Sequence, residues 1–273
     1  MLVATVLALT AALLHAGWNL RAKRSPDRLI SLWGQFFVAG VVSVPVVVAT
    51  HDLPAAAWGF AALTAVTHVP YAAFLAAAYD HGDFSVAYPI ARGSGAALAG
   101  LGGVLLLGDD LGVLGGVGLL TVAAGMVVLA AGADRVHVLL ALGVGVTIGV
   151  YTVNDSHASR TFGVTYAFAA FALAAVAVTS YGVVHRGAPA LVASMRTDWR
   201  RHVVSGAMTA AAYVMVLIAV RRAPVGYVAS LRESSVLAAA FLGTRYLSEG
   251  QSRRRTAAAV VILTGLVLLV VSG

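Results

Sequence analysis

Residues 85–107 read SVAYPIARGSGAALAGLGGVLLL, and this stretch decides the fold class. It is long enough to cross a bilayer, which takes about 20 mostly apolar residues. It nevertheless carries Tyr88 and Arg92, where a helix surrounded by lipid would be apolar throughout. Because an ionised side chain in mid-membrane costs about 3 kcal/mol or more, Arg92 indicates a functional or packing role. We expect a membrane helix whose polar face is turned toward other helices.

The rest of the chain has the same apolar character. Of 273 residues, 60% are hydrophobic and 11% are charged, and the mean hydropathy is +0.91. Soluble domains carry about a quarter charged residues, so the composition predicts an integral membrane protein. The sequence has no cysteine, which excludes a disulfide scaffold, a Cys-ligated zinc site and a thiol nucleophile.

Apolar stretches of this length recur along the whole chain and predict ten membrane helices. Too few residues remain between them for a soluble domain, so the function must lie within the membrane. No Lys or Arg precedes the first stretch, and no small-residue cleavage site follows it, so we expect a retained helix rather than a signal peptide. The predicted spans are 2–20, 29–49, 57–79, 85–107, 111–131, 136–155, 163–184, 202–220, 225–244 and 256–272.

The ten spans divide into two similar sets, residues 1–132 and 136–273. Residues 88–94 (YPIARGS) in the fourth span correspond to 229–235 (ASLRESS) in the ninth, and acidic turns follow at 107–109 and 247–249. An odd number of spans per set gives the two sets opposite orientations in the membrane. We therefore predict an all-α integral membrane protein of two inverted five-helix repeats.

The alignment of the two sets has two possible offsets, which differ by one residue. An offset of 140 pairs Arg92 with Arg232, whereas an offset of 141 pairs it with Glu233. The first pairing gives a positive cavity and the second a nearly neutral one. This choice decides between anionic and zwitterionic substrates.

The basic residues predict the orientation of the chain. The sequence has 18 Lys and Arg and a net charge of +7. Thirteen of the 18 lie in the connections after odd-numbered spans, and three (Arg160, Arg221 and Arg222) lie in the connections after even-numbered spans. By the positive-inside rule the odd connections are cytoplasmic and both termini are outside. Basic clusters between spans are expected to meet anionic lipid headgroups, so no nucleic-acid partner is predicted.

Polar and ionisable side chains inside the spans are the candidate substrate site. His15 and Asn19 are four residues apart on one helical face, and Tyr151 and Asp155 repeat that spacing at the matching place in the second set. Opposite orientation of the two sets would place them around a central cavity at the midplane, as alternating access requires. The candidate residues are His15, Asn19, Tyr71, Arg92, Tyr151, Asp155, Tyr213, Arg232 and Glu233.

Each candidate also has a purely structural interpretation. Arg92 could satisfy helix ends or pair with Glu233, because buried ion pairs can exist only to relieve their own desolvation. Asp155 lies at the end of its predicted span, where water could solvate it. Stripes of small residues predict helix-packing faces, and lone aromatic residues predict core or interfacial anchors. The stripes are 95/99/103, 108/112/116 and 141/145/149, and the anchors are Trp18, Tyr79 and Tyr166.

The sequence contains no motif of enzymatic chemistry. His-Glu-x-x-His, Gly-x-Ser-x-Gly, P-loop and dinucleotide-binding patterns are all missing from it. We therefore predict no catalytic residue, no metal site and no cofactor. Transport energy would then come from a gradient rather than from ATP.

The motifs around the polar positions resemble the EamA family of the drug/metabolite transporter superfamily, over essentially the whole chain. The resemblance is carried by the segments 15–19 (HAGWN), 88–93 (YPIARG) and 232–235 (RESS), and by Asp109 and Glu249. It implies a multi-pass carrier of the bacterial inner membrane, an exporter of amino acids or other small metabolites, with a cavity lined by spans one, three, four, six, eight and nine. Members of the family are thought to keep both termini in the cytoplasm, which is opposite to the charge count.

These observations predict a secondary transporter, a monomer or a homodimer, for a small polar metabolite such as an amino acid or an organic anion. Arg92 and Arg232 would bind a carboxylate, and Glu233 and Asp155 would meet an amine or take up a proton. His15 would add pH sensitivity, because an unperturbed imidazole titrates near neutral pH. Asn19, Tyr71, Tyr151 and Tyr213 would orient the substrate. The alternative is a structural or sensing membrane protein whose buried charges only lock helices together.

Overall fold

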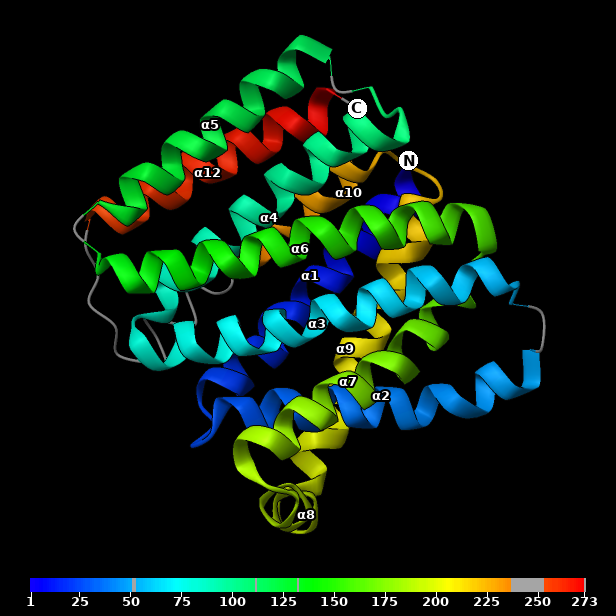
Figure 1. Ribbon diagram of the computed structural model, residues 1–273. Helices are drawn as coiled ribbons and strands as arrows, with labels where there is room; N and C mark the ends of the chain where they lie inside the picture. Colours follow the sequence, from blue (N-terminus) through cyan, green and yellow to red (C-terminus); the bar gives the residue numbers. More distant parts are fainter. Residues whose placement is uncertain (51–52, 111, 132, 237–252, 273) are drawn as a thin grey trace.

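The computed structural model describes residues 1–50, 53–110, 112–131, 133–236 and 253–272, and all regular structure in these residues is helical. The long helices cross one another in a bundle, with both termini on the same side (Figure 1). The all-helical prediction is confirmed. The helices are α1 (Leu2–Lys23), α2 (Arg28–Thr50), α3 (Ala55–His81), α4 (Phe84–Leu107), α5 (Gly112–Ala130), α6 (Arg135–Phe162), α7 (Tyr166–Arg186), α8 (Ala188–Thr197), α9 (Trp199–Val220), α10 (Val225–Arg232) and α12 (Arg253–Ser272).

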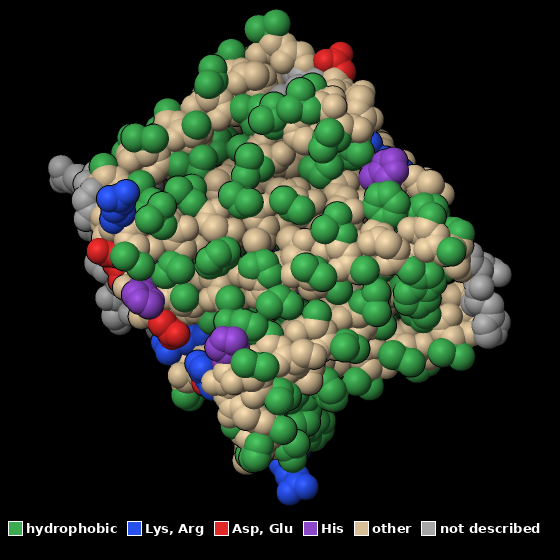
Figure 2. All heavy atoms as spheres, viewed as in Figure 1, with side chains coloured by type: hydrophobic (Ala, Val, Ile, Leu, Met, Phe, Trp, Pro, Cys, Tyr) green, Lys and Arg blue, Asp and Glu red, His purple; other side chains and the backbone are tan. Residues whose placement is uncertain are grey.

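Seven of the described helices are long and apolar enough to cross a membrane: α1, α2, α3, α4, α6, α7 and α9. Shorter apolar segments lie in α5 (Gly112–Val128) and α12 (Ala257–Leu269). Figure 2 shows hydrophobic side chains spread over the middle of the visible face, with the charged side chains near its edges. This distribution is that of a multi-pass membrane protein, whose helices satisfy their own backbone hydrogen bonds in lipid.

Helix α6 is longer than predicted, which corrects the interpretation of Asp155. The helix continues to Phe162 rather than ending at 155. Ser156 and Ser159 are buried in this extension, and their hydroxyls are satisfied there because they donate to carbonyls of the preceding turn, at 2.6 and 3.1 Å. Asp155 is therefore an interior helical residue, 1% exposed, and the expectation of a solvated helix end is wrong.

The connection between the seventh and eighth predicted spans contains an additional helix, α8. Gly187, with φ of 81°, ends α7, and α8 begins immediately after it. Leu191 is the one buried residue among the ten of α8, so this helix lies on the surface of the bundle. A search for spans of about 20 residues cannot find it because it is too short to cross a bilayer.

The ninth predicted span is interrupted where its charges lie. Helix α10 ends at Arg232, and Glu233 and Ser234 form a turn. Hydrogen bonds between residues three apart, from Ser234 N to the Leu231 carbonyl and from Val236 N to the Glu233 carbonyl, tighten the chain there. The rest of this span, to residue 244, and the acidic turn at 247–249 lie outside the described residues.

Small residues bring some helices into close contact, as two of the three predicted stripes require. A Cβ atom on Gly95 of α4 would lie 2.6 Å from Ile148 of α6, and one on Gly149 would lie 2.7 Å from Leu98. The third stripe is wrong as a packing face: no atom lies within 4 Å of a Cβ built on Gly108, Gly112 or Gly116. Gly108 and Gly112 instead have φ of 70° and 56°, which suits the turn between α4 and α5.

Helix contacts recur in pairs. Helix α3 packs on α6 as α1 packs on α9, and α3 packs on α7 as α2 packs on α9. Likewise α4 contacts α5 as α10 contacts α12, while α2 with α7 and α5 with α12 pair directly. If each of the first five predicted spans is replaced by the span five places later, and the reverse, each of these named contacts becomes its counterpart.

Candidate functional site

Polar side chains of α1, α3, α6, α9 and α10 surround two small adjoining cavities within the bundle. The cavities share Tyr151, Tyr213 and Arg232 in their walls. The larger, of about 30 Å³, is also lined by His15 and Tyr71, among others. The smaller, of about 10 Å³, is lined by Asp155 on its other side. Six of the nine predicted site residues therefore meet here.

Arg92 is held by Glu233 rather than facing the cavities. Its Nε and Nη2 donate to the two carboxylate oxygens at 3.2 and 2.6 Å, and the side chains are 4% and 2% exposed. Such a two-point contact is the strongest arrangement for arginine and a carboxylate. Next to it, Tyr88 donates to Ser235 at 2.9 Å, which joins α4 a second time to the segment that follows α10. The structure thus pairs Arg92 with Glu233 rather than with Arg232, and the positive charge of Arg92 is neutralised.

Arg232 points the other way, to His15 on α1. Its Nη2 lies 3.2 Å from His15 Nε2, while the indole N–H of Trp18 lies 3.3 Å from His15 Nδ1. A neutral imidazole accepts at one nitrogen and a protonated imidazole at neither, so at most one of these donors is satisfied. Arg232 Nε has no hydrogen-bond partner among the described residues. Arg232 is therefore a buried cation with donor capacity to spare.

Asp155 sits among hydroxyl and amide donors. Its Oδ1 accepts from Thr64, from Tyr166 at 2.8 Å and from Asn154 at 3.3 Å. Its Oδ2 accepts from Tyr213 at 2.8 Å. Among the described side chains none forms an ion pair with it. Neutral donors alone hold this carboxyl group, so it can meet a cation or exchange a proton without breaking an ion pair.

Aromatic rings form the wall between these groups. The rings of His68 and Tyr151 stack with centroids 4.7 Å apart, and Tyr71 meets Tyr151 edge-on at 6.0 Å. On the other side Phe171 meets Tyr213 edge-on at 4.7 Å. Rings of this kind fix the shape of a cavity and bring hydroxyl groups to it.

Asn19 takes part in helix packing and does not line either cavity. Its amide donates to the His15 carbonyl at 2.8 Å, and its Oδ1 accepts from Tyr79 of α3 at 2.7 Å. The related position in the second set, Asp155, instead carries a carboxyl group that accepts from four donors, so the two positions differ in chemistry and in surroundings.

Polar groups without partners face the cavities. Besides Arg232 Nε, the hydroxyls of Thr209 and Thr152 are buried and make no hydrogen bond within the part of the chain that the structure describes. Thr209 lines the larger cavity and Thr152 the smaller. Buried polar groups are usually satisfied, so these three sites point to a polar occupant. No three His, Asp or Glu side chains of the described residues are grouped to hold a metal ion.

Ion pairs and hydrogen bonds join the helices at both ends of the bundle. At the end that holds the termini, Arg160 of α6 pairs with Asp109 at 2.9 Å, and Asp109 accepts from the backbone N–H of Val225 at 2.8 Å. At the other end Lys23 donates to the carbonyls of Tyr79 and Gly82, at 2.6 and 2.8 Å. The cavities thus lie between two sets of contacts that tie helices together.

Several residues that complete the site had no distinctive sequence signal. Tyr166 and Trp18 were expected to be anchors, yet they contact Asp155 and His15. Thr64 and Asn154 also bond to Asp155 and were not singled out. Threonine and asparagine form hydrogen bonds between membrane helices in general. These two are therefore distinguished only by their contact with a buried carboxyl group.

The model of the EamA-like transporter family matches residues 135–271. The chain therefore belongs to this family, which is part of the drug/metabolite transporter superfamily, and the predicted resemblance is confirmed. The protein is accordingly a multi-pass membrane transporter of a small molecule, in a family of transporters rather than enzymes.

Solved structures extend this similarity over both halves of the chain. One of them, titled "Crystal structure of protein", superposes with a TM-score of 0.73 at 18% sequence identity, over 98% of this chain and 97% of that one. In all, 28 chains of solved structures match. A search of curated proteins returns no significant match. The structural similarity concerns the fold and leaves the substrate to be argued from the site.

Proposed function

We propose that this transporter exports a small zwitterionic metabolite, of the amino-acid class, across the bacterial inner membrane. It does so by alternating access between two inverted repeats, residues 1–132 and 136–273. The carboxylate of the substrate binds Arg232, and its ammonium group binds Asp155.

The observation that carries the proposal is the buried, incompletely bonded guanidinium of Arg232 in the wall shared with Asp155. Arg92 and Glu233 cancel each other's charge. One cation and one carboxyl group then remain beside the cavities, which favours a zwitterion over an anion. His15 is a weak competitor for Arg232 because Trp18 uses the same imidazole, so a substrate carboxylate displaces it readily.

Alternating access is supported by the paired helix contacts and by the size of the cavities. Volumes of about 30 and about 10 Å³ admit a water molecule but no metabolite. The helices must therefore separate before substrate enters. The pair of Arg160 with Asp109 would open for one side, and the contacts of Lys23 for the other. Because the two sets correspond, rocking one against the other would open the ends in turn.

Asp155 is the proposed proton carrier as well as the ammonium ligand. Its four donors are neutral, so protonation leaves no unpaired cation behind. Competition between a proton and the substrate ammonium for one carboxyl group couples their movements in opposite directions. Such an exchange would use a proton gradient directed into the cell to export the substrate.

The test is a thermal-shift titration of the detergent-solubilised protein with matched ligands. Each L-amino acid is compared with its N-acetyl form, which lacks the ammonium group, and with its amide, which lacks the carboxylate. A ligand present at 100 times its Kd stabilises the folded state by about 2.7 kcal/mol. We expect that shift for at least one amino acid and a much smaller one for both of its derivatives.

Arg232→Gln should abolish this response, whereas Arg222→Gln should retain it, because Arg222 is exposed and lies outside the cavities. A response of equal size in Arg232→Gln would contradict the proposed site, and so would an N-acetyl or amide form that shifts the protein as much as the parent amino acid does. Hits should then be tested for transport in proteoliposomes with an imposed pH gradient.

A further inference from the structure

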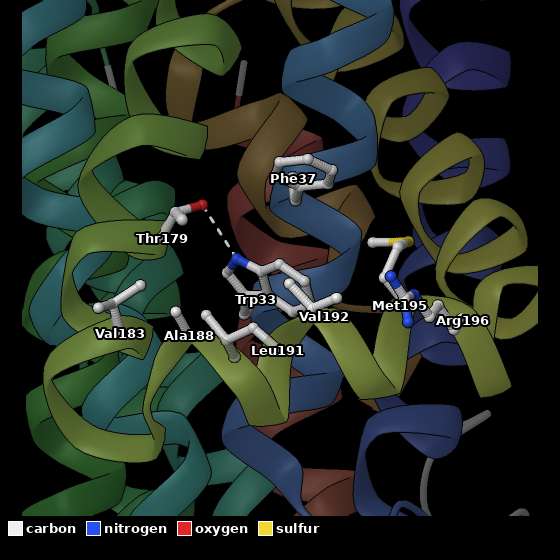
Figure 3. Close-up of a pocket in the computed structure, with 9 residues that line it drawn as sticks. All are labelled: Trp33, Phe37, Thr179, Val183, Ala188, Leu191, Val192, Met195 and Arg196. Carbon is white, nitrogen blue, oxygen red and sulfur yellow. Dashed lines mark hydrogen bonds between the residues drawn. The ribbon is translucent and has the colours of Figure 1, made fainter.

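A second cavity system lies on the outside of the bundle, between α2, α7 and α8. The part beside α8 has a volume of about 380 Å³. In Figure 3, Trp33 and Phe37 of α2 face Leu191 and Val192 of α8 there. A further cavity of about 310 Å³ continues along α2 and α7 to Val44 and Val176. Both cavities are lined by Phe37 and Thr179, so together they form one groove, which we name the α2–α7 groove.

The α2–α7 groove is apolar and open to the bilayer. Val44, Val176 and Val192 in its walls are 48, 65 and 50% exposed, on helices that cross or border the membrane. Within its walls the Trp33 indole donates to the Thr179 hydroxyl at 2.9 Å, so these two polar groups satisfy each other (Figure 3). Along α2 it extends from Trp33 to Val44, a rise of about 16 Å at 1.5 Å per residue. These dimensions suit an extended hydrocarbon chain.

One end of the groove carries a positive charge. Arg196, in the last turn of α8, lines it and is exposed, and it pairs with none of the described acidic residues. The neighbouring Arg186 is different, because Asp27 holds it at 2.5 Å. The segment from 196 to 201 contains Arg196, Arg200 and Arg201 against Asp198. A surface helix with basic residues is the form in which proteins meet anionic headgroups.

We propose that the α2–α7 groove binds an anionic phospholipid, with one acyl chain along α2 and α7 and the phosphate at Arg196. The transporter site inside the bundle uses none of these residues. The lipid would fix α8 against α2 and α7, and so stabilise the end of the bundle where Arg186 and Lys23 lie.

The probe is fluorescence quenching of Trp33 by phospholipids with brominated acyl chains. Detergent-solubilised full-length protein is titrated with dibromo-phosphatidylglycerol or dibromo-phosphatidylcholine. The signal of Trp33 is the difference between the wild type and Trp33→Phe. We expect half-quenching by the glycerol lipid at about a fivefold lower mole fraction than by the choline lipid, which is the effect of one basic residue near an anionic headgroup.

Matched variants distinguish the contribution of the Arg196 charge from that of the apolar groove that binds the acyl chain. Arg196→Gln should equalise the two lipids, whereas Arg200→Gln, outside the groove, should retain the difference. Val192→Phe should reduce quenching by both lipids because it fills the groove. Val184→Phe should not, since Val184 is 78% exposed and does not line the groove. Glycerol 3-phosphate, which lacks the chains, should displace neither lipid.

Equal half-quenching by both lipids in the wild type, an unchanged preference in Arg196→Gln, or displacement by glycerol 3-phosphate would overturn the proposal. Absence of Trp33 quenching in a protein that elutes as a dimer would also overturn it, and would assign the groove to a second copy of the chain.

Discussion

Arg92 illustrates how one side chain divides between structure and function. Its charge is the feature that distinguishes the fourth span in the sequence. In the structure, however, its guanidinium is paired with Glu233, and both side chains are buried. Removing one partner of a buried ion pair leaves an uncompensated charge, whereas replacing both with apolar residues can be neutral. The pair is thus a joint between α4 and the end of α10.

We predict that Arg92→Met and Glu233→Leu each destabilise the protein by about 3–5 kcal/mol, and that the double variant recovers most of the loss. Thermal unfolding in detergent measures this cycle, with the exposed Arg222→Met as control. Additive losses would show that the two residues act independently and would return Arg92 to the list of substrate ligands.

Asp155 is predicted to couple transport to protons. Asp155→Asn keeps the shape and most hydrogen bonds but cannot take up a proton. In proteoliposomes it should lose transport driven by a pH gradient and lose the advantage of zwitterions over N-acetyl derivatives. Thr161→Val, at an exposed hydroxyl of the same helix, should leave both intact. Gradient-driven transport by Asp155→Asn at wild-type rates would exclude Asp155 as the carrier.

The nine predicted site residues show what residue type can indicate. Ionisable groups in apolar spans were found because their cost in lipid is large wherever they lie. Six of the nine predicted residues line the cavities. Arg92 and Glu233 do not, because they are paired with each other. The four-residue spacing from His15 predicts Asn19 as a site residue, but Asn19 contributes to helix packing instead. Thr64 and Tyr166 were missed because their importance comes from one neighbour, Asp155, distant in the sequence.

Helices α5 and α12 approach each other closely at two glycines. A Cβ atom on Gly118 would lie 2.7 Å from the Gly265 carbonyl oxygen, and one on Gly265 would lie 2.6 Å from that of Gly118. Gly116, two residues earlier, has no atom within 4 Å of a Cβ. Small residues of this kind allow membrane helices to approach.

We therefore predict that Gly118→Ala destabilises the protein by about 1–3 kcal/mol, the usual cost of overpacking. Gly116→Ala should be neutral or stabilising by up to about 1 kcal/mol, because alanine is the better helix former. Detergent unfolding curves of the two variants provide the comparison. Equal effects would show that α5 and α12 separate without strain.

For the molecule as a whole, the distribution of basic residues predicts which end faces the cytoplasm. Since the chain has no cysteine, single introduced cysteines report accessibility without background. Figure 1 shows α8 at the end of the bundle opposite the termini. Thr197 is the last residue of α8, Thr161 lies in the last turn of α6, and both are exposed. An impermeant maleimide should label Thr161→Cys on intact cells, and Thr197→Cys only after permeabilisation. The reverse pattern would place both termini in the cytoplasm, and all proposed contacts would stand with the two sides exchanged.

The sequence by itself determined that this is an all-helical membrane protein, where most of its spans lie and which side chains are costly to bury in them. These properties are local, because hydropathy and the cost of a charge in lipid depend on residues within one span. Only the tertiary structure decided that Arg92 meets Glu233 while Arg232 meets His15, that neutral donors surround Asp155, and that α8 covers a groove. The reason is geometric: successive residues project about 100° apart around a helix, so a partner depends on helix rotation and not on position along the chain.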